Sequence, residues 1–333
     1  MINSKLGIGP MSSEVIEAVY RYSHFFRKEL MLIVSKNQVD YSGGYVNNWN
    51  TEQYTSFLEE MRNKYSNSNV KSCRDHCGPG FSGNMSMEDT YKTIETDIEN
   101  RFDLIHIDLC HYQGTNKERL YESKKAIEHC LNLNNEIALE IGTDENVGSM
   151  YSINSLEEIQ QEIDFFKSFS NPDFYVVQTG SLVMEINQMG SFNKSFLIES
   201  NKLIHENDIK IKEHNADYLS KSQIQERNGI VDAMNIAPQL GVVQTSYILN
   251  KCLIYGINFD DYANLVYKSK KWEKWMHKNN AQNKYLCIQI AGHYHFSSDE
   301  YKIIINQLNN HEDINENIIE TLTNVIDHYE SCN

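Results

Sequence analysis

Eight short apolar runs, separated by longer amphipathic stretches, are the feature that most limits how this sequence can fold. Each run has the length of a buried strand, and the stretches between them repeat their apolar residues at helical spacing. Parallel strands need a long crossover between them, and the amphipathic stretches provide it. The predicted strands are residues 6–9, 30–34, 70–73, 104–108, 137–141, 174–178, 209–214 and 234–236.

This strand count matches the closure of a parallel sheet into a barrel. We therefore predict a (β/α)8 TIM barrel over residues 1–243. A doubly wound open sheet is the alternative, because it shows the same alternation of strand and helix. Residues 244–333 carry aromatic side chains in helical patterns, and we expect a C-terminal helical extension packed on the barrel.

The net charge and the cysteine content indicate which partners the protein can bind and in which compartment it is expected. The formal net charge is −16, from 46 acidic and 30 basic side chains, which disfavours nucleic acids and anionic membranes as partners. The cysteines are seven in number and scattered, a pattern that favours a reducing cytoplasm over a disulfide framework. No apolar run approaches the roughly 18 residues of a membrane-spanning helix, and the first residues do not resemble a signal peptide.

Polar side chains gather where the predicted strands end. In a barrel the carboxyl ends of the strands form one face, where such folds keep their chemistry. Asp75 and His76 stand side by side before the segment 78–80, whose Gly-Pro-Gly sequence stops both strands and helices. Since a strand alternates its side chains, we expect this pair to share a site only because the strand is ending there.

Imidazole and carboxylate groups delivered by several strand ends suit a divalent cation such as Zn²⁺. An aspartate beside a metal-bound histidine stays ionised and can act as a general base, while a second carboxylate can orient a ligand by hydrogen bonding. The alternative for each histidine is that it only packs and hydrogen-bonds at a strand end. The predicted catalytic residues are Asp75, Asp108 and Glu140, and the predicted metal ligands are His76, His214, Gln178 and Glu213.

Two glycine-containing segments, 42–44 and 179–181, could offer backbone N–H groups to a phosphate, although either is also typical of a turn. Neither matches a nucleotide-binding loop, so no nucleotide cofactor is expected. In the extension we interpret His293 and His295 as structural and Trp272 and Trp275 as core. The predicted substrate- and phosphate-binding residues are Asn37, Gln38, Gly43, Gly44, Gly180, Ser181, Asp217, Tyr218 and Asn235.

Taken together, these segments resemble the tagatose-bisphosphate aldolase subunit family often labelled non-catalytic, which also includes ketose(-phosphate) 4-epimerases. The two most specific pieces are Asp75-His76-Cys77-Gly78-Pro79 and Glu213-His214-Asn215-Ala216-Asp217-Tyr218. The resemblance covers nearly the whole chain. Its other matching segments are 35–39, 43–45, 105–108, 140–143, 176–180, 294–296 and 326–329.

That family is similar in turn to class II, metal-dependent aldolases, which are (β/α)8 barrels. The resemblance implies a phosphorylated ketose as substrate, Asp75 as the base on its C4 hydroxyl, and a divalent metal, expected to be Zn²⁺, on His76 and His214. Cleavage of the C3–C4 bond would make the protein an aldolase, and re-addition to the other face of the aldehyde would make it a 4-epimerase. One position departs from the pattern, because Gln178-Thr179-Gly180 stands where class II aldolases have a His-Gly step.

The departure at Gln178 leaves a second function open. The chain could be a partner subunit that stabilises a separate catalytic aldolase, or that associates with itself, without catalysing a reaction. A third possibility is a sugar-binding protein with the form of a barrel.

Overall fold

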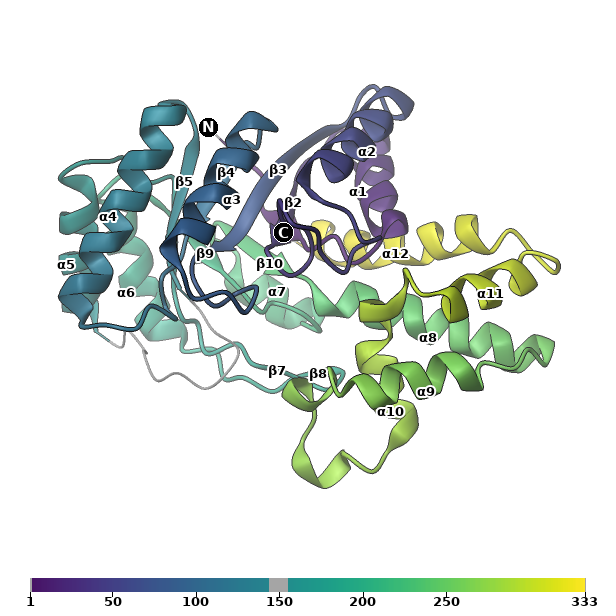
Figure 1. Ribbon diagram of the computed structural model, residues 1–333. Coiled ribbons are helices and arrows are strands. Elements are labelled where there is room, and N and C mark those ends of the chain that lie inside the picture. The colour runs from purple at the N-terminus through teal and green to yellow at the C-terminus, as the bar shows by residue number, and fades with distance from the viewer. Residues whose placement is uncertain (1, 144–154, 333) are drawn as a thin grey trace.

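The computed structural model describes residues 2–143 and 155–332. Within them, eight parallel strands close into a barrel in the order β1-β10-β9-β6-β5-β4-β3-β2 (Figure 1). The predicted (β/α)8 TIM barrel is confirmed, and the open-sheet alternative is wrong because the strand β1 pairs with both β2 and β10. The barrel strands are β1 (Leu6–Ile8), β2 (Glu29–Ser35), β3 (Asn69–Cys77), β4 (Leu104–Ile107), β5 (Ala138–Gly142), β6 (Phe174–Val176), β9 (Lys210–Glu213) and β10 (Ala233–Ile236).

Helices follow the strands and cover the outside of the barrel (Figure 1). Most begin at a Ser, Thr or Asn whose side chain accepts a hydrogen bond from the first helical turn, as Ser12 does from Val15 N–H. A short hairpin, β7 (Val183–Met184) and β8 (Asn187–Gln188), follows β6. The helices of the barrel are α1 (Ser13–Phe26), α2 (Thr51–Lys64), α3 (Met87–Glu99), α4 (Asn116–Leu133), α5 (Leu156–Lys167), α6 (Lys194–His205), α7 (Lys221–Arg227) and α8 (Pro238–Tyr255).

The C-terminal part is helical, as predicted, and it is built into the wall of the barrel. The boundary predicted after residue 243 falls inside α8, which is continuous to Tyr255. The last helix, α12, packs against α1 and α8 (Figure 1). The elements of this extension after α8 are α9 (Asp260–Ser269), η1 (Glu273–Trp275), η2 (Lys278–Asn280), α10 (Lys284–Ala291), η3 (Gly292–His295), α11 (Asp299–Leu308) and α12 (Ile314–Glu330).

One apolar cluster joins the barrel to its extension. Val15 of α1, Leu240 of α8 and Leu322 of α12 are all buried in it. Because the same core includes both parts of the chain, we expect them to unfold together. None of the described helices is long and apolar enough to cross a membrane.

A bulge in β3 brings Asp75 and His76 to the same side of the sheet. Cys73 belongs to the cluster inside the barrel, whereas Cys77 packs in the layer between strands and helices. The pairing of β3 with β4 shifts between Arg74 and Cys77, and His76 has a φ of 48°, in the left-handed region. The prediction that the strand ends before this pair is wrong, because β3 continues to Cys77 and an inserted residue breaks the alternation.

Arg74 lies just before the bulge and points away from the barrel interior. Its guanidinium forms two hydrogen bonds of 2.6 Å to the carboxylate of Asp97 on α3, and it also donates to the carbonyls of Val34 and Val39. Arg74 and Asp97 are both fully buried. Removing one partner of such a pair strongly destabilises a protein, because the other charge is left buried and unpaired. The pair therefore fixes β3 against α3 and β2 next to the irregular residues.

If the barrel and the extension share one core, a cavity in α12 should destabilise the whole chain. We expect Leu322→Ala to lower the free energy of unfolding by about 2–5 kcal/mol, because Leu322 is fully buried. The control is Leu253→Ala, which removes the same atoms from a side chain that is 61% exposed and should cost less than about 1 kcal/mol. Urea unfolding followed by circular dichroism measures both, and two separate transitions in Leu322→Ala would contradict a shared core.

Candidate metal centre and active-site cavity

Three imidazoles and one carboxylate meet at the carboxyl end of the barrel. Asp75 and His76 come from β3, His106 from β4 and His214 from the residue after β9, and one donor atom from each lies within 4.8 Å of the others. From the Asp75 carboxylate, the distances are 3.7 Å to His76 Nε2, 3.5 Å to His106 Nδ1 and 3.9 Å to His214 Nε2. Side chains far apart in sequence thus converge on one point.

This donor set fits a divalent cation. Ligand atoms about 2.1 Å from a tetrahedral ion are about 3.4 Å apart, so the observed separations need only a small contraction. Oδ1 of Asp75 is buried and has no hydrogen-bond partner, which is costly unless something else satisfies it. Three imidazoles beside a carboxylate are typical of zinc sites.

Hydrogen bonds outside the cluster orient two of its imidazoles. His76 Nδ1 lies 2.7 Å from Asp108 Oδ2, so the proton resides on Nδ1 and the lone pair of Nε2 is directed to the cluster. Asp108 is itself held by Thr143 Oγ1 at 2.9 Å and by the backbone N–H of Cys110 at 3.0 Å. The carboxylate predicted to orient a ligand is thus hydrogen-bonded to one of the cluster imidazoles.

His106 is oriented by the backbone of β5. Its Nε2 donates to the carbonyl of Gly142 at 2.8 Å, which leaves the lone pair of Nδ1 on the side of Asp75. The backbone N–H of His76 also points at this Nδ1, at 3.3 Å. The bulge of β3 is therefore tied directly to the imidazole that β4 supplies.

Glu140 lies next to two of the cluster imidazoles, on the side of the barrel interior. Its Oε1 is 3.0 Å from His214 Nε2 and 3.7 Å from His106 Nδ1, while its Oε2 accepts from the buried Lys212 ammonium at 2.5 Å. Burial opposes the charge of Glu140, but Lys212 and the two imidazoles prevail and lower its pKa to about 2. Glu140 is therefore ionised and adds a negative charge directly beneath the imidazoles.

Asp75 remains ionised although it is buried. Burial alone would raise its pKa, but the imidazoles of His76, His214 and His106 hold the pKa well below its usual range. Asp75 also lines the cavity that opens on the cluster, so its carboxylate can be reached by a substrate hydroxyl.

One predicted ligand, Glu213, is turned away from the cluster. Glu213 is buried, but its oxygens bind Arg227 at 2.6 and 2.9 Å and accept from the hydroxyls of Thr179 and Ser181. Its neighbours Lys212 and His214 face the barrel interior, so alternation along β9 turns Glu213 outward. Gln178 is half-buried just after β6 and does not line the cavity.

His106 was not assigned a role from the sequence, although a signal was present. It precedes Asp108 by two positions, and residues two apart on a strand face the same side. The pattern of polar residues at strand ends does not include His106, because it lies within β4.

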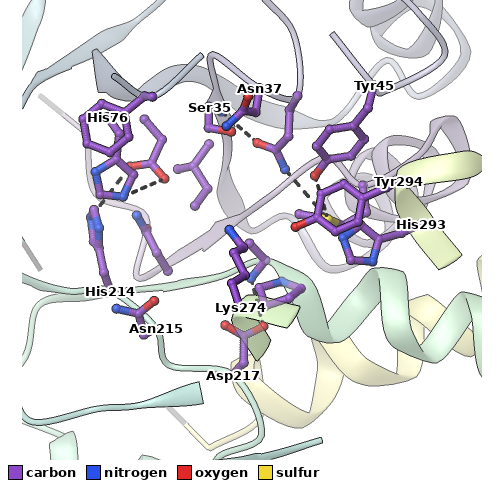
Figure 2. Close-up of a pocket in the computed structure, with 18 of the residues that line it drawn as sticks. Ser35, Asn37, Tyr45, His76, His214, Asn215, Asp217, Lys274, His293 and Tyr294 are labelled. Carbon is purple, nitrogen blue, oxygen red and sulfur yellow. Dashed lines mark hydrogen bonds and ion pairs between the residues drawn. The ribbon is translucent and has the colours of Figure 1, made fainter. Parts of the chain in front are cut away.

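The cavity above the cluster has a volume of about 390 Å³. Figure 2 shows His76 and His214 at one side of it and Tyr45, His293 and Tyr294 at the other. Four predicted substrate-binding residues line its wall, and these are Asn37, Gln38, Asp217 and Asn235. The predicted residues that do not line it are Gly43, Gly44, Gly180, Ser181 and Tyr218.

The glycine segments are engaged elsewhere. Gly43 N–H donates to the carbonyl of Asp40 at 2.9 Å, which closes a turn. Gly180 lies against the backbone of Ser191, where a Cβ would come within 2.1 Å of the Ser191 carbonyl oxygen. Both segments are therefore accounted for by turn formation and close packing.

Asn235 is placed to bind a ligand. Both polar atoms of its amide are buried and have no hydrogen-bond partner, and the side chain lines the cavity. Gly7 on the neighbouring β1 makes room for it, since a Cβ there would lie 2.2 Å from Asn235 Oδ1. An amide left unsatisfied in this way needs a partner, and a hydroxyl in the cavity could provide one.

The extension supplies a second wall of the cavity. Lys274, Trp275, His293 and Tyr294 all line it. Trp272 is buried in the core as predicted, and Trp275 packs against the same core while also lining the cavity. His293 is buried on the same wall, and its assignment as structural stays a prediction.

Comparisons with known proteins show similarity of fold. No family model matches the sequence, and no curated protein matches it. A structure described as a probable tagatose 6 phosphate kinase from Sinorhizobium meliloti 1021 covers 99% of this chain and 100% of its own, with a TM-score of 0.79 and 14% identity.

Two aldolases are also similar in structure. Fructose-bisphosphate aldolase from Campylobacter jejuni matches 92% of this chain and 90% of its own, with a TM-score of 0.58 and 13% identity. The YdjI aldolase from Escherichia coli K12 matches 92% of this chain and 91% of its own, with a TM-score of 0.52 and 13% identity. At such low identity these matches establish an aldolase-like fold alone.

The cluster predicts which residues govern metal affinity. We expect the apoprotein to bind one Zn²⁺ and His106→Ala to weaken that binding by at least about 100-fold, since even residues behind a ligand cost 10- to 100-fold. Gln178→Ala should change it by less than about threefold, because three imidazoles are already present and Gln178 does not line the cavity that opens on them. Titration against a chromophoric chelator measures both.

The control for His106→Ala is His129→Ala. His129 lies on α4, partly exposed, with Glu95 as its partner at 3.0 Å. Zinc affinity that falls in Gln178→Ala but not in His106→Ala would show that the ion binds elsewhere.

Proposed function

We propose that this protein is a metal-dependent enzyme that acts on a ketose phosphate of the tagatose or fructose type by retro-aldol chemistry, as an aldolase or a C4 epimerase. The observation that carries the proposal is the meeting of His76, His106 and His214 with the ionised Asp75 at the mouth of the barrel. The names of the structural neighbours, which refer to aldolases and to a tagatose 6 phosphate kinase, support this class of substrate.

His76, His106 and His214 would hold the metal, and Zn²⁺ is the ion that three imidazoles suit best. When bound, it supplies a Lewis acid that polarises the C2 carbonyl of the sugar. Asp108 and the Gly142 carbonyl keep His76 and His106 in the tautomers that such binding requires.

Asp75 would act as the general base. Its carboxylate takes the proton of the C4 hydroxyl, the C4–O bond becomes a carbonyl, and the electron pair of the C3–C4 bond passes toward the C2 carbonyl. Asn235, with an unsatisfied amide on the cavity wall, would hold a substrate hydroxyl during this step. Release of the aldehyde and protonation of the remaining enolate at C3 complete an aldolase reaction. Rotation and re-addition of the aldehyde, with the proton returned by Asp75 to the C4 oxygen, complete a C4 epimerisation.

The rival function, a non-catalytic subunit that stabilises a separate aldolase, is less well supported. It rested on Gln178 replacing a ligand histidine. His106 provides a third imidazole from a different strand, so the departure at Gln178 does not leave the cluster short of ligands. A stabilising subunit would also have no need of a reachable ionised carboxylate.

The test is turnover of ketose phosphates by the zinc-loaded protein. We expect wild type to convert at least one of the fructose or tagatose mono- and bisphosphates, and Asp75→Asn to lower kcat by about 10²- to 10⁴-fold, the usual contribution of a general base. Triose phosphate release, followed by a coupled assay, detects an aldolase, and chromatography of the sugars detects an epimer.

Asp299→Asn is the matched control, since its side chain is 91% exposed on α11. It should retain the wild-type rate. Because Asp75 supplies one of the four donor atoms of the cluster, the zinc content of each variant is measured by elemental analysis and rates are compared at equal zinc content. Absence of product from every ketose phosphate, or an undiminished rate in Asp75→Asn, would refute the proposal.

A further inference from the structure

The wall that the extension contributes to the cavity carries positive charge without a counter-ion. Lys274 lines the cavity, and Lys271 lies behind Tyr294. Among the ion pairs of residues 2–143 and 155–332, none includes either lysine. The buried lysines of the barrel differ, since Lys36 pairs with Asp89 and Lys212 with Glu140, each at 2.5 Å.

Aromatic rings hold these two ammonium groups in place. Lys274 Nζ lies 4.3 Å from the centre of the Trp275 ring, and Lys271 Nζ lies 4.9 Å from that of Tyr294 and 5.9 Å from that of Tyr45. Trp275 Nε1 in turn donates to the Tyr294 hydroxyl at 3.2 Å. A cation over a ring is attracted but not neutralised, so the charges remain available to a ligand.

The electrostatics of this wall favour an anion. Burial lowers the pKa of both lysines. Burial, together with the charges of Lys274 and Lys271, lowers the pKa of His293 to about 3. His293 is buried, and its Nδ1 has no hydrogen-bond partner. In a protein of net charge −16, a wall of this kind selects for negatively charged ligands.

We propose that Lys274, with the neighbouring His293 and Tyr294, forms a subsite for the phosphate monoester of the substrate on the cavity wall that the extension supplies, and that Lys271, against the ring of Tyr294, adds positive charge to it. Two lysines provide separate point charges with rotatable donors, which suit a tetrahedral dianion, whereas a planar carboxylate is more often bound by the fork of an arginine. The carboxylate of Asp217, which also lines the cavity, is held by the backbone N–H groups of Ala237 and Gln239.

The position of the phosphate subsite relative to the metal cluster would determine which sugar phosphates bind productively. Figure 2 shows His76 and His214 at one side of the cavity, His293 and Tyr294 at the other, and Lys274 between them. A phosphate bound among Lys274, His293 and Tyr294 would therefore lie apart from the reacting carbons. Binding energy gained there would hold C4 against Asp75. The inference rests on the proposed function for the identity of the sugar, but phosphate binding itself can be measured without turnover.

The experiment is calorimetric titration of the zinc-loaded protein with inorganic phosphate, with acetate at equal ionic strength as the comparison. We expect saturable binding of phosphate by wild type, at least about tenfold weaker binding by Lys274→Gln, and recovery to within about threefold of wild type in Lys274→Arg. The fluorescence of Trp275, which lies under Lys274, provides an independent reading of the same binding.

Lys278→Gln is the matched control, because it removes the same charge from the same segment at a residue that does not line the cavity. It should bind phosphate as wild type does. Three results would overturn the subsite: no saturable binding by wild type, equal binding by Lys274→Gln, or acetate binding as tight as that of phosphate.

The outcome can be separated from that of the proposed function. If phosphate binds and the binding depends on Lys274, but the protein turns over no ketose phosphate, the result supports the subsite and refutes the proposed reaction. Turnover of ketose phosphates with the same KM in wild type and Lys274→Gln would support the reaction and refute the subsite.

Discussion

The candidate site depends on one inserted residue in β3. Without the bulge, alternation would send His76 outward to the helices and separate it from Asp75. A non-glycine residue at a φ of 48° costs about 1–3 kcal/mol, so surrounding contacts must hold it there. The bond of His76 to Asp108, its backbone contact with His106 and the buried pair of Arg74 with Asp97 provide that support. Strain retained at such a position is a common mark of a functional site.

The fold could be predicted from the sequence because it depends on periodicity. Eight apolar runs with helical stretches between them admit few topologies, and each of the eight barrel strands overlaps its predicted run. The proximity of the Asp75 and His76 side chains was also predicted, but the predicted cause was a strand end and the actual cause is a bulge. Both features place the side chains of two consecutive residues on the same side. Local sequence does not show where a strand shifts its register, because the shift is fixed by partners such as Asp97 that lie elsewhere in the chain.

The errors in the site have two physical origins. Glu213 was misjudged because the facing of a strand residue depends on parity, which is set by the register of the whole barrel, and His106 was missed because it lies within β4 and not at its end. That Trp275 and His293 also line the cavity could not be predicted, because their position depends on how the extension folds back over the barrel, and periodicity within a helix gives no information on that. Asn235 was selected correctly, but its unsatisfied amide and the space that Gly7 leaves for it are visible only in three dimensions.

The cations of the barrel are buried, whereas Lys271 and Lys274 of the extension are exposed, and the two groups divide the protein into two functional parts. In the barrel, Arg74, Lys212 and Arg227 are each neutralised by a carboxylate, which keeps strands and helices in register without adding charge to the cavity. In the extension, Lys271 and Lys274 rest on aromatic rings and keep their charge. The barrel thus holds the groups suited to bond breaking, and the extension holds those suited to recognising an anion. Because α8 and α12 bind both parts into one core, the distance between the two sets of groups is fixed by the fold itself, and with it the length of the molecule that can reach both at once.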